Sequence, residues 1–224
     1  MKTTKVKIRI NSIFPSINGE VSGKGQGSLC TFIRFQGCNL RCSYCDTKYS
    51  QDRDAGDEWT IPRIIKVVKS YGLRNITITG GEPLLQQNGL TQLVKALQDA
   101  YCNDVSINIE TNGSFPIPDM WGVVWIADWK GPSSNMYCNM KISNLVELTS
   151  KDFVKFVIAD EQDFLNAIKV MKMVHRPVFA FSPVQGKRIK LQPRELVDKM
   201  LAEKVCRTNN SIFNLQIHKL IDVA

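Results

Sequence analysis

Three cysteines, Cys38, Cys42 and Cys45, lie on one short stretch of the chain with the spacing C-x3-C-x2-C. Thiolates this close together can hold three irons of a cubane [4Fe–4S] cluster, whose full protein ligand set is four cysteines. The stretch supplies three, so one iron stays open to a ligand that is not protein. An open iron can bind and reduce a substrate, so the spacing predicts a cluster that carries out chemistry.

Two other interpretations of the cysteines exist: three incidental thiols, or a zinc site completed by a distant histidine. Structural zinc takes four Cys or His ligands, commonly as paired C-x2-C motifs. The chain has only two histidines and its spacing differs from that pattern. The cluster is therefore the favoured interpretation.

The length and composition indicate a single α/β domain over residues 1–224, because a chain that is 43% hydrophobic can bury one substantial core. No run of about 18 apolar residues is present, and the first residues lack the apolar centre of a secretory signal. We therefore expect a cytoplasmic protein with reduced thiols. The other cysteines are interpreted as ordinary small residues: Cys30, Cys102, Cys138 and Cys206.

The formal charge of +8 is spread along the sequence rather than gathered in one run. A basic chain can bind nucleic acid or a membrane surface, but scattered Lys and Arg are more typical of a solvated surface. The charge alone therefore predicts neither partner.

Alternating and β-branched segments predict a series of strands. The strand over 29–35 is the most informative, because it delivers the cysteine stretch at its carboxyl end, where α/β sheets carry their chemistry. The other predicted strands cover 5–13, 75–79, 104–110, 123–127, 153–158, 178–182 and 212–216.

Helices are predicted between several of these strands. Thr60 and Pro62 begin one that ends near Gly72. Others are expected around 90–97, over 161–173, and from Pro193 with Leu196, Val197, Met200 and Leu201 facing inward. Alternating strands and helices, with polar motifs after the strands, predict an open partial (β/α) barrel with few helices.

A second motif, Thr79-Gly-Gly-Glu-Pro83, directly follows the strand over 75–79. Two glycines let a backbone approach a ligand closely, and we expect their amide N–H groups to be free to meet it. Glu82 can accept a hydrogen bond from an ammonium group. Arg34, on the strand before the cysteines, has a fork that suits a carboxylate. The glycine-rich segment 22–28 is expected to fold over a ligand.

The cysteine spacing, followed one β-α unit later by Gly-Gly-Glu-Pro, resembles the radical S-adenosylmethionine (SAM) superfamily. In that superfamily the amino and carboxylate groups of SAM chelate the open iron. One electron from the reduced cluster then cleaves SAM to methionine and a 5′-deoxyadenosyl radical. The resemblance implies a modified partial barrel of the radical SAM type.

Nearly the whole length, from Ile13 onward, resembles the 7-carboxy-7-deazaguanine synthase family within that superfamily. The most specific matches are the segments 32–47, 79–83, 110–113, 155–157 and 215–219. The resemblance implies a lyase that converts 6-carboxy-5,6,7,8-tetrahydropterin to 7-carboxy-7-deazaguanine with loss of ammonia, in queuosine-type 7-deazapurine biosynthesis. It also implies a [4Fe–4S] cluster, SAM, Mg²⁺, a homodimer, and reduced flavodoxin or ferredoxin as electron donor, with no nucleic-acid or membrane partner.

By position, the resemblance assigns a role to each matching residue, and it names no catalytic acid or base. Cys38, Cys42 and Cys45 would hold the cluster, and the hydroxyl of Thr47 would bind Mg²⁺. The residues expected to contact the pterin are Ile17, Asn18, Gly19, Glu20, Arg34, Thr79, His218, Lys219 and Ala224. Those expected to contact SAM are Gly81, Glu82, Asp128, Trp129, Lys130, Phe181, Ser182, Pro183 and Val184.

Two segments depart from the family pattern. The family usually has Gln-Gly-Glu-Gly where this chain has Asn18-Gly-Glu-Val21, and Gly-x-Pro where it has Asp222-Val-Ala224. The contacts of Asn18 and Ala224 are therefore expected to differ from those of the family.

Two rival functions remain to be weighed. Another small radical SAM enzyme, such as a glycyl-radical activase, would share the cluster motif but would not predict Arg34, Thr47 or the segment 215–219. A basic cluster-bearing RNA-binding or electron-transfer module is disfavoured, because three cysteines leave an iron open and basic residues do not interleave with aromatic ones.

Overall fold

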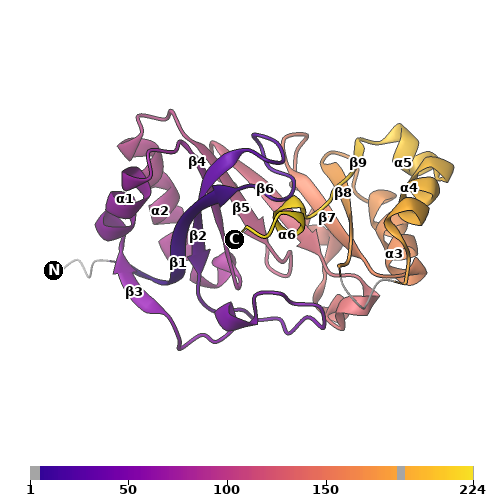
Figure 1. The fold of residues 1–224 in the computed structure, drawn as a ribbon, viewed down its shortest axis with the longest axis horizontal. Helices are drawn as coiled ribbons and strands as arrows, with labels where there is room; N and C mark the ends of the chain where they lie inside the picture. Colours follow the sequence, from indigo (N-terminus) through magenta and orange to yellow (C-terminus); the bar gives the residue numbers. More distant parts are fainter. Residues whose placement is uncertain (1–5, 186–189, 224) are drawn as a thin grey trace.

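A computed structural model of the chain describes residues 6–185 and 190–223, so the contact expected of Ala224 lies outside the described residues. The strands form one nine-stranded sheet in the order β3-β1-β2-β4-β5-β6-β7-β8-β9 (Figure 1). β1 is antiparallel to both of its neighbours, and the strands from β2 onward run parallel to one another. Their bounds are β1 Lys7–Ile17, β2 Leu29–Phe35, β3 Asp57–Thr60, β4 Asn75–Gly80, β5 Ser106–Thr111, β6 Val123–Trp129, β7 Phe153–Ile158, β8 Val178–Pro183 and β9 Ser211–Phe213.

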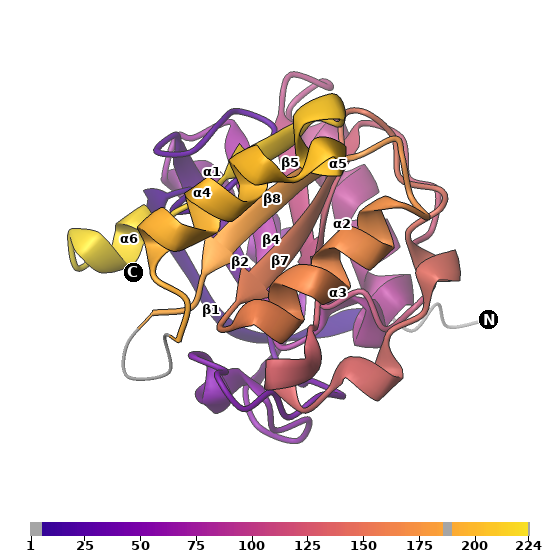
Figure 2. The ribbon, with the colours of Figure 1, turned by 90° about the vertical axis from the view of Figure 1, so that its right-hand side faces the viewer.

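Helices cover the sheet in two groups. In Figure 1, α1 (Ile61–Ser70) and α2 (Gln87–Ala100) lie at one end of the sheet, and α3 (Glu161–Met171), α4 (Pro193–Ala202) and α5 (Lys204–Thr208) lie at the other. Figure 2 shows α3 and α4 lying across β7 and β8. The short helix α6 (Ile217–Leu220) is separate from both groups. Over the described ranges, none of these helices is long and apolar enough to cross a membrane.

Alternation along each strand separates a hydrophobic outer face from a polar inner face, because successive side chains of a strand point to opposite sides. In β7, Phe156 joins the main core, where its ring stacks with Phe179 of β8 at 6.1 Å between centroids. Lys155, one position earlier, faces the inside of the sheet. The helices therefore cover one face, and the other is left for chemistry.

The predicted open α/β sheet with few long helices is confirmed, since the end strands β3 and β9 do not pair to close a barrel. Smaller expectations were wrong. β3 was not expected, because Asp57 and Glu58 look like loop residues and only their pairing with β1 makes them an edge strand. β9 is shorter than the predicted 212–216, and Leu201 of α4 is 62% exposed rather than inward.

Candidate active site

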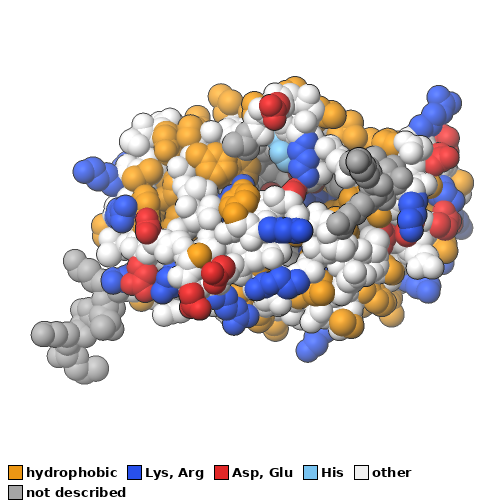
Figure 3. Space-filling view, turned by 60° about the horizontal axis from the view of Figure 1, so that its bottom comes forward, with side chains coloured by type: hydrophobic (Ala, Val, Ile, Leu, Met, Phe, Trp, Pro, Cys, Tyr) orange, Lys and Arg blue, Asp and Glu red, His pale blue; other side chains and the backbone are white. Residues whose placement is uncertain are grey.

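A cavity of about 510 Å³ lies inside the curve of the sheet. Its walls come from the strands β2, β4, β5, β6 and β7, the cysteine loop, the end of β1 and α6; Figure 3 shows a hollowed face with Lys and Arg side chains around the hollow. Most of the predicted site residues line it: Ile17, Gly19, Glu20, Arg34, Cys38, Cys42, Cys45, Thr47, Thr79, Gly81, Asp128, Lys130, Val184, His218 and Lys219.

The cysteine loop is closed by backbone hydrogen bonds between its two ends. Gly37, at a φ of +96°, donates to the carbonyl of Ser50 at 2.8 Å, and Cys38 N donates to Gln51 O at 3.1 Å. A positive φ of this kind favours glycine, which has no Cβ to clash. The closed loop holds the three cysteines on the wall of one cavity.

The three cysteines fit a cluster, because all are free thiols that face the cavity. Burial raises the pKa of Cys38, and it raises the pKa of Cys42 to about 11. A thiol with a raised pKa is protonated near neutral pH and loses its proton when it binds a metal ion. The donor set therefore suits three irons and leaves the fourth to another ligand.

Gly80, the last residue of β4, and Gly81, which follows it, are required by close packing against β2 and the cysteine loop. A Cβ at Gly80 would lie 2.2 Å from the carbonyl oxygen of Phe35, and one at Gly81 would lie 2.1 Å from that of Gly37. Gly81 N donates to Phe35 O at 3.1 Å and Glu82 N to Gly37 O at 2.8 Å. The amide of Gly81, which was expected to be free to meet a ligand, is therefore taken up in bracing the cysteine loop.

Glu82 also has a structural task. Its carboxylate is fully buried and accepts from Leu84 N at 2.9 Å, Thr111 Oγ1 at 2.8 Å and Asn112 N at 2.7 Å. It does not line the cavity, so the expected contact with an ammonium group is not supported by the geometry. Burial raises the pKa of Glu82 despite these donors. The side chain ties the turn after β4 to the turn after β5.

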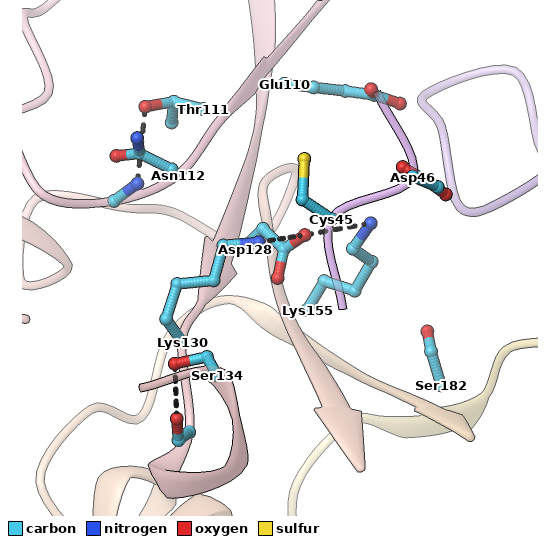
Figure 4. A network of polar contacts seen from close by, with 12 residues as sticks. Cys45, Asp46, Glu110, Thr111, Asn112, Asp128, Lys130, Ser134, Lys155 and Ser182 are labelled. Atoms are coloured by element: carbon cyan, nitrogen blue, oxygen red, sulfur yellow. Dashed lines mark hydrogen bonds and ion pairs between the residues drawn. The ribbon is translucent and has the colours of Figure 1, made fainter. Parts of the chain in front are cut away.

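A buried charge network crosses the cavity, centred on Asp128 at the end of β6 (Figure 4). Lys130 Nζ lies 2.9 Å and Lys155 Nζ lies 3.2 Å from Asp128 Oδ2. Lys155 Nζ also lies 2.7 Å from Glu20 Oε2. Burial alone would raise the pKa of Asp128, but the two ammonium groups outweigh it and lower the pKa. Burial alone would lower the pKa of Lys155, but Asp128 and Glu20 raise it well above its ordinary value. Asp128, Lys130 and Lys155 therefore stay ionised near neutral pH.

Glu110 and Lys155 line the cavity, although neither was among the predicted site residues. Thr79 Oγ1 donates to Glu110 Oε2 at 2.7 Å, and burial raises the pKa of this carboxyl group. Strand alternation could have found Glu110. Glu110 pairs with Ile126 in the middle of β6 and stands two residues after Asn108, which reaches Thr77 inside the sheet, so both side chains lie on the same face.

Arg34 reaches the cavity from β2 without a carboxylate partner among the residues that the structure describes. Its Nε is buried and makes no hydrogen bond there, and its Cζ lies 5.6 Å from the Phe14 ring centroid and 5.8 Å from that of Tyr49. A guanidinium held between rings with unused donors is suited to an anionic ligand.

The segment after β1 and the helix α6 pack together on one side of the cavity, which we call its floor, and Gly19 makes this packing possible. A Cβ at this position would lie 1.8 Å from His218 Nδ1, so only glycine lets α6 lie against this segment. Ile217 N donates to Gly19 O at 2.9 Å, which ties α6 down. Burial lowers the pKa of His218, so the imidazole is mainly neutral near pH 7. Lys219 extends to the rim and pairs with Asp46 of the cysteine loop.

Asn18 does not line the cavity, unlike its predicted role. Its Oδ1 accepts from Thr77 Oγ1 at 2.7 Å, and its Nδ2 donates to Ser28 Oγ at 3.0 Å. The short side chain therefore ties Ser28, at the end of the glycine-rich segment, to Thr77 of β4.

Four residues expected to contact SAM also lie away from the cavity lining. Trp129 faces the outer core and donates from Nε1 to Asn166 Oδ1 at 2.8 Å, and Phe181 packs against other rings of that core. Ser182 Oγ accepts from Asn214 Nδ2 at 2.7 Å. Pro183 is buried and does not line the cavity. These side chains hold the strand ends in place.

The chain has clear relatives. The profile of the Radical SAM superfamily matches residues 32–123. A 7-carboxy-7-deazaguanine synthase of Clostridium acetobutylicum is 36% identical, covering 93% of this chain and 93% of the relative. One of Methanospirillum hungatei is 34% identical, covering 96% of this chain and 85% of the relative.

A solved structure supports the fold. The crystal structure of QueE from Escherichia coli superposes with a TM-score of 0.73 at 20% identity and covers 93% of each chain. The extent of the match to the synthases, together with three free cysteines on the wall of one cavity, shows that the chain belongs to the 7-carboxy-7-deazaguanine synthase family of the radical SAM superfamily.

Proposed function

We propose that this chain converts 6-carboxy-5,6,7,8-tetrahydropterin to 7-carboxy-7-deazaguanine with loss of ammonia. Membership of the synthase family supports this reaction, and the observation that carries it is the cavity that the three cysteines share with Arg34 and Glu20. A cation without a carboxylate partner suits the carboxylate of the pterin. The carboxylate of Glu20, on the floor of the cavity, suits the hydrogen-bond donors of the pterin ring.

Two groups of residues divide the work of binding. Cys38, Cys42 and Cys45 would hold the cluster, which with SAM supplies a 5′-deoxyadenosyl radical when an electron is delivered. Gly81 and Val184, with the Asp128–Lys130 ion pair, would hold SAM on one side of the cavity.

The pterin would lie on the other side of the cavity. Glu20 would accept from its ring, and Arg34 would bind its carboxylate. Thr79 would contact the substrate from β4, with its hydroxyl proton already donated to Glu110. Ile17, Gly19, His218 and Lys219 would close the cavity around it.

Thr47 is the residue we propose as a Mg²⁺ ligand. Its hydroxyl lines the cavity and lies 3.8 Å from Cys45 Sγ. It makes no capping hydrogen bond to the helical turn that follows, which is the structural task that a threonine in this position often has. The hydroxyl is thus available to a hard cation.

Two partners are proposed on the family resemblance: reduced flavodoxin or ferredoxin as the electron donor, and a second copy of the chain in a homodimer. Neither is needed to explain the geometry described above, and both stay predictions.

Product analysis tests the function. Anaerobically reconstituted protein, given SAM, dithionite and the carboxypterin, is expected to form 7-carboxy-7-deazaguanine and ammonia. 5′-Deoxyadenosine should form in quantity only when the pterin is present. A requirement for a separate protein substrate would instead support an activase, and 5′-deoxyadenosine without any deazaguanine product would contradict the proposal.

A further inference from the structure

One sulfur of the cysteine loop receives more hydrogen-bond donors than the others in the described residues. Leu40 N lies 3.4 Å from Cys38 Sγ, and Asn112 Nδ2 lies 3.8 Å from the same atom. N–H groups lie farther from sulfur than from oxygen because sulfur is larger. Cys45 has a contact only with the hydroxyl of Thr47, at 3.8 Å. The donors therefore concentrate on Cys38.

The orientation of the Asn112 amide is fixed by its neighbours. Its Oδ1 accepts from Ser114 N at 3.0 Å and from Ser114 Oγ at 2.7 Å. A backbone N–H can only donate, so the atom that it meets is the oxygen and the NH₂ group must point the other way. One N–H of that group meets Asn39 Oδ1 at 2.9 Å, which leaves the second for Cys38 Sγ.

The turn that carries Asn112 is itself held firmly. Asn112 N and Thr111 Oγ1 both donate to the buried carboxylate of Glu82, and Asn144 Nδ2 donates to Gly113 O at 3.0 Å. Asn112 is 7% exposed. The amide is therefore positioned before any cluster is bound, rather than being drawn toward the sulfur by it.

We propose that Asn112 tunes the reduction potential of the cluster by donating a hydrogen bond to the sulfur of Cys38. Hydrogen bonds to the sulfurs are one of the means by which a protein sets the potential of an iron–sulfur cluster. The reduced cluster carries one more negative charge, so a donor stabilises it more than it stabilises the oxidised cluster. Asn112 thus raises the potential and makes the electron easier to accept.

This proposal rests on the cluster site of the proposed function but not on the identity of the substrate. The midpoint potential can be measured by an EPR-monitored redox titration of the reconstituted protein without SAM or pterin. A wild-type protein that failed to assemble a cluster would contradict both hypotheses, whereas one that assembled a cluster but formed no deazaguanine product would count against the proposed function alone. The two hypotheses can therefore be tested separately.

Asn112→Leu keeps the approximate shape and removes the donor. We expect its midpoint potential to fall, with iron and sulfide per chain unchanged. The ratio of reduced to oxidised cluster at a fixed potential should drop about tenfold, which is about 59 mV for one electron. Asn112→Asp removes the same N–H and adds a negative charge, so its potential should fall further.

Asn39→Ala is the matched control. Asn39 belongs to the same network, through bonds to Ser114 Oγ at 2.8 Å and to Asn112, but it gives no hydrogen bond to the sulfur. Its potential should stay at the wild-type value. An unchanged potential in Asn112→Leu, or an equal shift in Asn39→Ala, would overturn the proposal. Loss of iron from both Asn112 variants would also overturn it, since Asn112 would then hold the loop rather than tune the cluster.

Discussion

Lys155 Nζ lies 2.7 Å from Glu20 Oε2, which joins the middle of β7 to the floor of the cavity. The two residues are 135 positions apart in the sequence. The same ammonium group lies 3.2 Å from Asp128, on the side of the cavity that we assign to SAM. One buried cation thus connects the proposed pterin and SAM sides of the site.

This connection makes Lys155 a positioning residue for both ligands. A buried carboxylate needs a partner, because removing one member of a buried pair leaves an uncompensated charge. Asp128 keeps Lys130 as a second partner, whereas Glu20 has no other cation within 4.0 Å among the described residues. Glu20 therefore depends on Lys155 more than Asp128 does.

Lys155→Met should destabilise the protein by roughly 3 kcal/mol, the usual effect of breaking a buried pair. It should also weaken pterin binding more than SAM binding. Calorimetric unfolding and equilibrium binding of each ligand would measure both effects. Lys190→Met is the matched control, because Lys190 is 77% exposed and lies 3.8 Å from Asp160. That change should alter stability by less than about 1 kcal/mol.

Adding Glu20→Gln to Lys155→Met removes the carboxylate that was left without a partner. The double variant should therefore regain part of the lost stability, although not pterin affinity. If the stability lost by the double variant equalled the sum of the losses of Lys155→Met and Glu20→Gln, Lys155 and Glu20 would not interact. Lys155 would then not position Glu20.

Cys38→Ala, Cys42→Ala and Cys45→Ala should each reduce the iron content and abolish turnover, because each removes one of three cluster ligands. Cys30→Ala should retain its iron, since Cys30 is fully buried in β2 and does not line the cavity. Iron and sulfide analysis after reconstitution measures the difference. Equal iron loss from Cys30→Ala would show that the ligand assignment is wrong.

Arg34→Lys should weaken pterin binding roughly tenfold, about 1.4 kcal/mol, while SAM binding stays nearly unchanged. Lysine keeps the charge but lacks the fork that can hold a carboxylate through two hydrogen bonds. Arg176→Lys, at an exposed position before β8, is the matched control and should change neither affinity. Equal losses of both affinities at Arg34 would mean that it supports the cysteine loop instead.

Local patterns in the sequence were sufficient to place most of the sheet. The strand over 29–35 is found at those positions, because its β-branched and aromatic residues fit a buried strand whatever lies beside it. The strand Asp57–Thr60 could not be found in this way, since only pairing with residues 7–10 stabilises it. Edge strands of polar residues depend on a neighbour that is distant in the sequence.

The candidate site was predictable in its motifs but not in the direction of its side chains. Glu82 and Phe181 lie in motifs that reach the cavity, but their own side chains do not. The carboxylate of Glu82 accepts hydrogen bonds from three donors of the protein, and the ring of Phe181 faces the outer core. Lys155 was passed over because a lysine inside a hydrophobic strand reveals its partners only when Glu20 and Asp128 are brought to it. Such partners are set by tertiary packing.

Glu110→Gln should stabilise the protein increasingly as the pH rises from about 5 to about 8. Burial raises the folded-state pKa of Glu110 above its ordinary value of 4.5, so the folded chain binds this proton more tightly than the unfolded chain. The stability that Glu110 contributes is therefore present at low pH and is lost as the pH rises toward its folded pKa. Glutamine does not titrate, so the variant lacks this loss.

Thermal unfolding across that pH range checks the sign, since 1 kcal/mol shifts the Tm by about 2–4 °C for a chain of this size. Glu147→Gln, at an exposed position, should stay within about 0.5 kcal/mol of the wild type at each pH. A Tm difference for Glu110→Gln that stays constant or shrinks with rising pH would contradict the raised pKa.

Thr47→Ala should lose the stimulation of turnover by Mg²⁺ while still assembling the cluster and binding SAM. Mg²⁺ takes oxygen ligands and usually keeps several waters, so one neutral hydroxyl cannot hold it tightly without oxygens from the pterin. Mg²⁺ should therefore bind tightly only when the substrate is present, and orient it toward the radical. Thr47→Ser keeps the hydroxyl and should keep the stimulation. A Thr47→Ala protein with an unchanged Mg²⁺ response would assign the ion to other ligands.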